Sequence, residues 1–415
     1  MNFNGTRVLV LDGYGRQCAI VLKELHDLGC VITTLNTAKW DVGYASKYPK
    51  YKLIEPATRY DMDTLKKVLD REIPSGKYDV VFPMLEPATE VLWHNKDNYQ
   101  KYVKYAAADE EGFHKAFNKQ LTMELCMRNG INCPITKMDD ETIDEFLNKV
   151  QFPLILKPRV GSGSRGIHKA SSKEELDLLI ASGEVNVEEY VIQEFVKSGE
   201  THRVSYTFID DNNVTKTSML AKSTRPYPLG IGTNSLFESC KMPEIALQAE
   251  KLLKLMNWHG YASVCFIESD EDHIPKVMEI NGRISASIKT SYCCGAHVVR
   301  QILERAYGQE VTSYMGDYPE GVRVRHAQAS TMWFLKSPDR FRDGFFNFKK
   351  TKDFVFTIAD PWPWFAYSIG CTRKYKTEMD KRERVVSSNS NRGGILNSTL
   401  INHSYCNLQS LEVAA

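Results

Sequence analysis

The sequence predicts an α/β fold that opens with a parallel sheet, and three stretches carry this prediction. Residues 6–36 read as an apolar strand, an amphipathic helix and a second strand, which is a βαβ unit. Residues 153–167 read as an apolar strand followed by a glycine-rich loop. Residues 260–285 read as a β-hairpin whose second strand carries alternating polar side chains. We therefore expect parallel strands first and an antiparallel hairpin later in the chain.

Composition favours an ordinary globular protein of two or three domains. The 415 residues include 53 basic and 52 acidic side chains, so the formal charge is +1. No global field then attracts nucleic acid or an anionic membrane, and neither is an expected partner. No apolar run reaches membrane-spanning length, and the ten cysteines show neither zinc spacing nor a CxxC pair. We expect reduced thiols and a cytoplasmic protein.

The first glycine turn departs from a dinucleotide site. Gly13 and Gly15 fit the start of a GxGxxG pattern, but Cys18 replaces the third glycine. Leu35 and Asn36 close the second strand, where an acidic residue would bind ribose. A plain parallel-sheet unit is therefore favoured over an NAD site.

A further strand and helix at residues 79–93 belong to the N-terminal domain, which we expect to span residues 1–108. Glu86 follows the carboxyl end of this strand, where open α/β sheets bind ligands. Glu86 is either a substrate contact or a cap of the strand end, and the sequence favours neither interpretation over the other.

A helix is expected from residue 109 to Gly130, and it contains Lys119. Gly130 ends this helix and Pro134 prevents its return, so residues 109–150 are expected to form a small linker domain. Taken alone, Lys119 would be a solvated helix lysine.

The glycine-rich loop can fold over a polyphosphate. Gly161, Gly163 and Gly166 let backbone N–H groups approach anionic oxygens, while Lys157 supplies a point charge. Farther on, Glu194 to Val196 form a hinge that can offer backbone groups to a purine, and Glu200 can accept from ribose hydroxyls.

Residues 218–239 contain Arg225 and read as a long mobile loop near the site, with a plain surface hairpin as the alternative. In the later hairpin, Glu279, Asn281 and Arg283 alternate, so an extended strand points all three to one face. The carboxylate and amide oxygens suit Mg²⁺, and the guanidinium complements a phosphoryl group.

The end of the chain is less informative. Residues 311–386 are expected to be a strand-rich region that completes the fold, and it includes the aromatic residues 360–370. Residues 387–415 turn polar and lose periodicity, which predicts a disordered tail. No internal repeat occurs, which excludes a duplicated two-site synthetase.

This ordered set of motifs resembles the ATP-grasp superfamily, and within it the single-module carbamoyl-phosphate-synthase-like carboxylate-amine ligase group. The resemblance spans residues 8–307. It implies a biotin-carboxylase-like parallel-sheet domain at the N-terminus, and an ATP-grasp domain of two α+β lobes at residues 151–310.

The resemblance also implies roles for individual residues. The expected ATP contacts are Lys119, Lys157, Gly161, Ser162, Gly163, Ser164, Gly166, Glu194, Phe195, Val196 and Glu200. Glu279 and Asn281 would bind one or two Mg²⁺ ions, with Mn²⁺ as an alternative. Arg283, Lys157 and Arg225 would serve catalysis, and Glu86, Arg225 and Arg283 would contact substrate.

One position departs from the family pattern. Cys265 stands on the strand before Glu279, where family members carry Glu, Gln or Asp as the other metal ligand. A thiol is a poor ligand for Mg²⁺. Water could replace the side chain, Glu268 or another acid could take over, or part of the catalysis is lost.

The resemblance implies an ATP- and Mg²⁺-dependent ligase that activates a small carboxylic acid as an acyl phosphate and couples it to an amine. The expected partners are these small molecules, with an amino acid as one candidate, and a homodimer is an option. A phosphotransferase on the same fold and a nucleotide-binding regulator with weakened catalysis remain open.

Overall fold

A computed structural model describes residues 2–59, 61–160, 166–198, 201–227, 229, 233–341 and 350–372. Several positions named above lie outside these ranges, namely Gly161, Ser162, Gly163, Ser164, Glu200 and residues 387–415.

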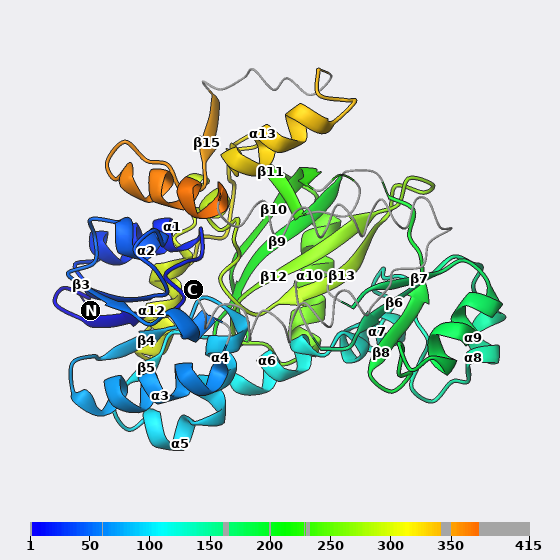
Figure 1. Ribbon diagram of the computed structural model, residues 1–415, viewed down its shortest axis with the longest axis horizontal. Helices are drawn as coiled ribbons and strands as arrows, with labels where there is room; N and C mark the ends of the chain where they lie inside the picture. The colour runs from blue at the N-terminus through cyan, green and yellow to red at the C-terminus, as the bar shows by residue number, and fades with distance from the viewer. Residues whose placement is uncertain are drawn as a thin grey trace.

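The N-terminal domain is an open parallel sheet with the strand order β3-β2-β1-β4-β5 (Figure 1). This confirms the predicted α/β fold class. Its elements are β1 (Arg7–Val10), α1 (Cys18–Asp27), β2 (Val31–Asn36), α2 (Val42–Ala45), β3 (Tyr51–Ile54), η1 (Pro56–Arg59), α3 (Met62–Glu72), η2 (Ile73–Ser75), β4 (Val80–Phe82), α4 (Glu86–His94), α5 (Lys96–Tyr99) and β5 (Lys104–Tyr105). The chain turns from one side of β1 to the other between β3 and β4, so the carboxyl ends of β1 and β4 form the switch point where such sheets bind ligands.

The second part of the chain contains two sheets, whose strand pairs are antiparallel except for β14 and β15, which pair in parallel. A small sheet has the order β7-β6-β8, and a seven-stranded sheet has the order β13-β12-β9-β10-β11-β14-β15. Their elements are α6 (Glu110–Phe117), α7 (Lys119–Arg128), α8 (Ile143–Leu147), β6 (Leu154–Pro158), β7 (His168–Ala170), α9 (Lys173–Ala181), β8 (Tyr190–Glu194), β9 (His202–Ile209), β10 (Thr215–Tyr227), β11 (Thr233–Cys240), α10 (Pro243–Leu255), β12 (Gly260–Glu268), β13 (Pro275–Asn281), α11 (Lys289–Cys293), α12 (Val298–Ala306), β14 (Arg323–Arg325), α13 (Ala327–Lys336) and β15 (Thr351–Asp353).

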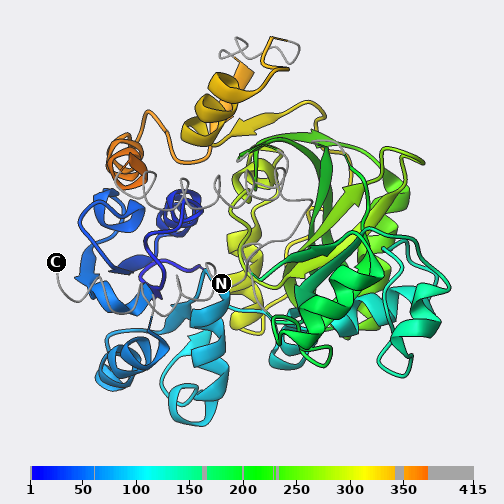
Figure 2. The same ribbon diagram turned by 45° about the vertical axis from the view of Figure 1, so that its right-hand side comes forward.

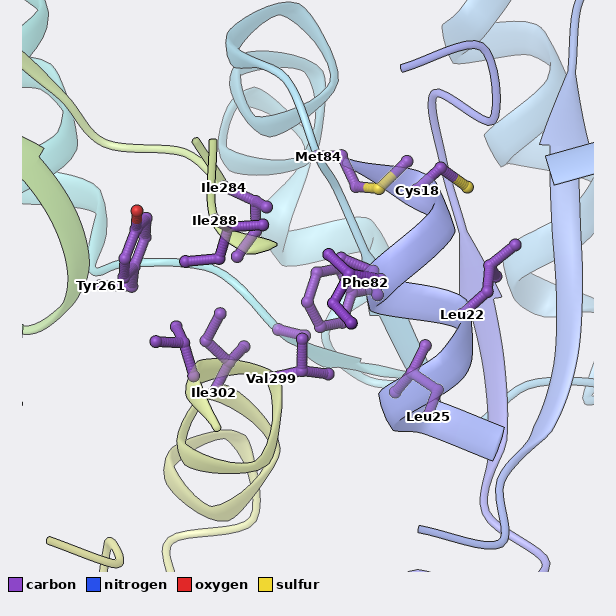
Figure 3. Packing of buried hydrophobic residues seen from close by; sticks show 14 of the residues in the cluster. Cys18, Leu22, Leu25, Phe82, Met84, Tyr261, Ile284, Ile288, Val299 and Ile302 are labelled. Atoms are coloured by element: carbon purple, nitrogen blue, oxygen red, sulfur yellow. The ribbon is translucent and has the colours of Figure 1, made fainter. Parts of the chain in front are cut away.

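One apolar cluster joins the N-terminal sheet to the seven-stranded sheet. Helix α12 follows β13 of the large sheet in sequence but packs on α1 of the N-terminal domain. Figure 3 shows Phe82 of β4 between α1 on one side and Ile284, Ile288 and Val299 on the other. Because these side chains are buried and interdigitate, the two sheets hold a fixed relative position.

Two expected elements differ from the structure. The helix predicted from residue 109 is two helices, because Asn118 has an extended backbone and its side chain accepts N–H bonds from Gln120 and Leu121. Residues 218–239 are mostly β10 and β11, so the mobile-loop prediction was wrong for the described part. β10 and β11 pair antiparallel in the large sheet.

The description of residues 311–386 as strand-rich was also wrong. The described part contains only the three-residue strands β14 and β15, beside α13 and a helix at residues 362–372. Trp364 and Tyr367 are three residues apart, which places both on the helix face that packs on the core. Figures 1 and 2 show this helix over the N-terminal domain, where Asp360 accepts a hydrogen bond from the Ser46 hydroxyl at 2.6 Å.

Phe82→Ala tests the packing between the sheets. The variant leaves a cavity between α1 and α12, so we expect the free energy of unfolding to fall by about 3–5 kcal/mol. Urea denaturation measures this loss. Leu178→Ala on α9 is the control, because this side chain is 60% exposed and its loss should change stability by less than ~0.5 kcal/mol. Equal effects of the two variants would contradict the packing argument.

Candidate active site

The end of β13 carries three polar groups joined by hydrogen bonds. The Asn281 amide donates to Glu279 at 3.2 Å, and the Asn281 oxygen accepts from the Arg283 guanidinium at 3.2 Å. Gly282 stands between Asn281 and Arg283, and a Cβ atom at this position would lie 2.5 Å from the ring of the buried Trp258. Only glycine fits this close approach, so it lets the strand end carry Asn281 and Arg283 against the core.

Arg283 forms an ion pair with Glu86 across the domain boundary. The guanidinium Nε lies 2.9 Å from the Glu86 carboxylate, which is at the first position of α4. Burial lowers the pKa of Arg283, but the charges of Glu86 and Glu279 raise it, and the net shift is upward. Glu86 is therefore a ligand of Arg283 at the switch point of the N-terminal sheet.

Two lysines approach Glu279 from other elements. Lys157 extends from β6, where its ammonium lies 3.4 Å from the Met278 carbonyl oxygen. Burial lowers the pKa of Lys157 to about 8, with Glu279 opposing and Lys119 adding to the shift. Burial also lowers the pKa of Lys119, while Glu279 and Glu86 oppose this effect. Lys119 begins α7 and is largely withdrawn from water, unlike the solvated helix lysine that its sequence position alone allows.

The expected purine hinge lies at the end of β8. Glu194 forms an ion pair with Lys276 of β13 at 2.9 Å, which ties the small sheet to the large one. Phe195 is 39% exposed, and the Lys169 ammonium lies 4.4 Å from its ring centroid. Val196 follows with a partly exposed side chain. The exposed Phe195 ring is compatible with stacking of a base. The backbone N–H groups of Glu194 and Phe195 already donate to the carbonyl oxygens of Ile135 and Pro153.

Arg225 lies near the end of β10 and is buried. Its guanidinium stands 5.2 Å from the ring centroid of Trp333 on α13. Its backbone is left-handed, with φ 62°. A bulky residue is uncommon in this region, and such outliers concentrate at functional sites.

The donor set fits one Mg²⁺ better than two. The Glu279 carboxylate and the Asn281 amide oxygen are hard ligands, and Mg²⁺ is commonly held by one or two carboxylates together with substrate phosphates. Cys265 lies directly opposite Glu279 in the strand register. Burial and the charge of Glu279 raise the pKa of this thiol, so it stays neutral. The Glu268 carboxylate, the alternative ligand, pairs with Arg203 at 2.7 Å.

Sequence reasoning missed Asp12 and Arg16, which follow β1 at the switch point. Asp12 has a left-handed backbone, and its carboxylate accepts N–H bonds from Met84 at 3.3 Å and Leu85 at 3.0 Å. Burial raises the pKa of Asp12 to about 7, although these two bonds oppose the shift. The switch-point rule, applied to β1 as it was to Glu86, would have found both residues.

Asp12→Asn tests this buried carboxyl. A carboxyl whose pKa is about 7 when folded and about 4 when unfolded makes the native state bind the extra proton between these values. Stability should therefore fall as pH rises from 5 to 8. The variant should lose that part of the slope and gain on the order of 2–4 kcal/mol over the wild type between these pH values.

Urea denaturation at pH 5 and pH 8 measures the effect. Asn tolerates the left-handed backbone, so the substitution does not add strain. Asp140→Asn, at an exposed position, is the control. Parallel pH curves for the wild type and Asp12→Asn would rule out the raised pKa.

The described residues also bear on the other expectations. They include no helix that is long and apolar enough to cross a membrane. The nine cysteines in the described ranges are free thiols. The homodimer and the cytoplasmic location stay predictions.

Comparison with known proteins gives the family context. Residues 116–287 match the model of the ATP-grasp domain. The chain is 31% identical over 87 residues to D-alanine–D-alanine ligase A of Bacillus cereus, and this match covers 20% of the chain and 29% of the relative. The chain thus spans less than a third of the length of that curated relative.

Two solved structures share the fold over most of the chain. The biotin carboxylase domain of Hydrogenobacter thermophilus 2-oxoglutarate carboxylase, in complex with MgADP, gives a TM-score of 0.62 at 13% identity and covers 76% of this chain and 73% of that one. An L-amino acid ligase from Bacillus licheniformis gives a TM-score of 0.54 at 16% identity, with 75% of each chain covered. Identities this low show the fold alone. The chain therefore contains an ATP-grasp domain at residues 116–287, within an architecture that biotin carboxylase shares.

Proposed function

We propose that the protein is an ATP-dependent carboxylate-amine ligase. The observation that carries this proposal is the convergence of Lys119, Lys157 and Arg283 on Glu279, from α7, β6 and the end of β13. Three cations around one carboxylate suit a triphosphate bound through a metal ion. The ligase relatives support the class of reaction, and an amino acid is the candidate for one substrate.

The reaction would proceed in two displacements. A carboxylate oxygen of the acid attacks the γ-phosphorus of ATP, the bond between the γ-phosphorus and the β-γ bridging oxygen breaks, and ADP leaves. The amine then attacks the carbonyl carbon of the acyl phosphate, loses a proton, and releases phosphate. The protein contributes position and charge in both steps, because Lys157 and Arg283 would face oxygens on which negative charge develops.

Glu279 and Asn281 would hold the magnesium ion of the nucleotide. When bound, Mg²⁺ neutralises phosphate charge and orients the γ-phosphoryl group. The Glu86 carboxylate keeps the Arg283 guanidinium in place at the domain boundary, where the N-terminal domain would present the acid.

Glu279→Gln tests the proposed site. The protein is incubated with MgATP, hydroxylamine and a panel of carboxylic acids, and both phosphate and hydroxamate are measured. We expect acid-dependent release of phosphate with equal hydroxamate formation, and a loss of about 100-fold or more in the variant. Glu271→Gln, in the exposed turn of the same hairpin, is the matched control and should retain activity.

Other outcomes of this assay discriminate the alternatives. ADP formation with a stable phosphorylated product would favour the phosphotransferase. An absence of turnover with every acid, together with tight ATP binding, would favour the regulator. Full activity of Glu279→Gln would contradict the metal assignment.

Cys265→Ala tests whether one magnesium site is sufficient. A neutral thiol does not coordinate Mg²⁺, so we expect the Mg²⁺ concentration at half-maximal activity to change less than about twofold. Activity is titrated with free Mg²⁺ at saturating MgATP. A severalfold rise in the required Mg²⁺ would show that Cys265 participates in metal binding.

A further inference from the structure

A second group of cations lies beside Arg283, at the carboxyl end of β1. Arg16 is half-buried, and its Nε donates to the Ala286 carbonyl oxygen at 3.2 Å. Its guanidinium stands 5.2 Å from the ring centroid of Phe354. Within the described ranges, no carboxylate lies within 4 Å of Arg16. A withdrawn guanidinium of this kind has hydrogen-bonding capacity that only a ligand or water can use.

His326 offers a second unused group in the same region. It lies between β14 and α13, and its ring meets that of Tyr367 at 5.7 Å. Its Nε2 atom is buried and has no hydrogen-bond partner among the residues that the structure describes. Burial and the charge of Arg16 hold the pKa of His326 well below its usual range, so the ring is neutral. In one tautomer Nε2 donates a hydrogen bond.

The surrounding charges add to the positive potential. Arg325 pairs in register with Asp353 of β15, but that carboxylate already accepts N–H bonds from Ala327, Val355 and Phe356 at 2.8–3.0 Å. Burial lowers the pKa of Arg325, and the charge of Arg225 lowers it further. The charge of Asp353 opposes this shift, but the net shift is downward. Among the described residues of this region, guanidinium groups outnumber carboxylates, so the region favours an anion.

The chain fixes the separation of Arg16 and Arg283. Arg283 donates to the Ile284 carbonyl oxygen at 3.4 Å, and Arg16 donates to that of Ala286. Both guanidinium groups are thus attached to one short segment, which the buried Ile284 anchors in the core (Figure 3). Glu86 compensates the charge of Arg283, whereas Arg16 faces no carboxylate at contact distance among the residues that the structure describes.

We propose that Arg16 and His326 bind a second anionic group of the acid substrate. This inference rests on the proposed ligase function and narrows its substrate class. The acid has one carboxylate that reacts near Arg283 and a second anionic group, a carboxylate or a phosphate-like group, that binds Arg16. Arg225 and Arg325 add positive charge around this subsite without being required as direct ligands.

Matched pairs of acids test the proposal in the hydroxylamine assay. Succinate, glutarate and adipate are compared with butyrate, valerate and hexanoate, which have the same carbon numbers, and phosphonopropionate represents the phosphate-like group. We expect kcat/KM to be about 10–100-fold higher for the preferred diacid than for its monoacid, as a charge-assisted hydrogen bond provides. Preference for phosphonopropionate over succinate would identify the phosphate-like source.

Arg16→Gln should reduce the ratio of diacid to monoacid kcat/KM to near one. Arg16→Lys keeps the charge and should retain part of the ratio. Arg128→Gln, an arginine that is 60% exposed on α7, is the matched control and should keep the full ratio. If Arg16→Gln does not fold, the wild-type ratio and Arg16→Lys still decide the question.

Failure of this inference and failure of the ligase proposal have different signatures. Turnover of monoacids and diacids with equal kcat/KM would overturn the second anionic subsite and leave the ligase intact. If no acid supports phosphate release, the ligase proposal fails. Calorimetry with succinate and glutarate in the presence of MgADP then tests the subsite, which requires binding by the wild type and its loss in Arg16→Gln.

Discussion

The ion pair between Glu86 and Arg283 is the contact on which the geometry of the site depends. Its two side chains are 10% and 20% exposed, and they come from the N-terminal sheet and the large sheet. Removing one partner of such a pair leaves an uncompensated charge in a partly buried place, which is strongly unfavourable. The pair holds only because the apolar cluster around Phe82 and Val299 fixes the two sheets relative to each other. Packing at the boundary therefore sets the position of the charge.

The features that the sequence predicted are those that depend on a short repeating pattern of side chains along the chain. Alternation along residues 276–285 placed Glu279, Asn281 and Arg283 together, and the structure joins them by hydrogen bonds. The family resemblance singled out Cys265, which the structure places opposite Glu279. The parallel opening sheet followed from a single βαβ unit. These predictions worked because strand period and turn chemistry depend on neighbouring residues.

The rest depends on contacts between distant segments. Arg16 meets Ala286 across 270 positions, and His326 is held by contacts with Ser235 and Tyr367, which are also distant in sequence. No local pattern encodes such contacts. The break at Asn118 was missed for a different reason, because its side chain competes with the helix for the backbone N–H groups of the next turn. Asn118 breaks the helix only when its side chain is positioned to cap α7, and amino-acid composition does not reveal that position.

Charge links the proposed nucleotide site to the proposed acid site. Lys157 has a pKa of about 8 because its burial outweighs the attraction of Glu279, so bound phosphates would stabilise its protonated form. Cys265 is a neutral thiol at the position where the family resemblance leads one to expect an acid or amide. In comparison with an acid, the thiol leaves one carboxylate fewer near Arg283. An acid with two negative groups would meet less repulsion there than beside a pair of metal-binding carboxylates. The thiol at Cys265 and the charge of Arg16, which no carboxylate of the described residues contacts, thus favour the same kind of substrate, because both make the region more positive.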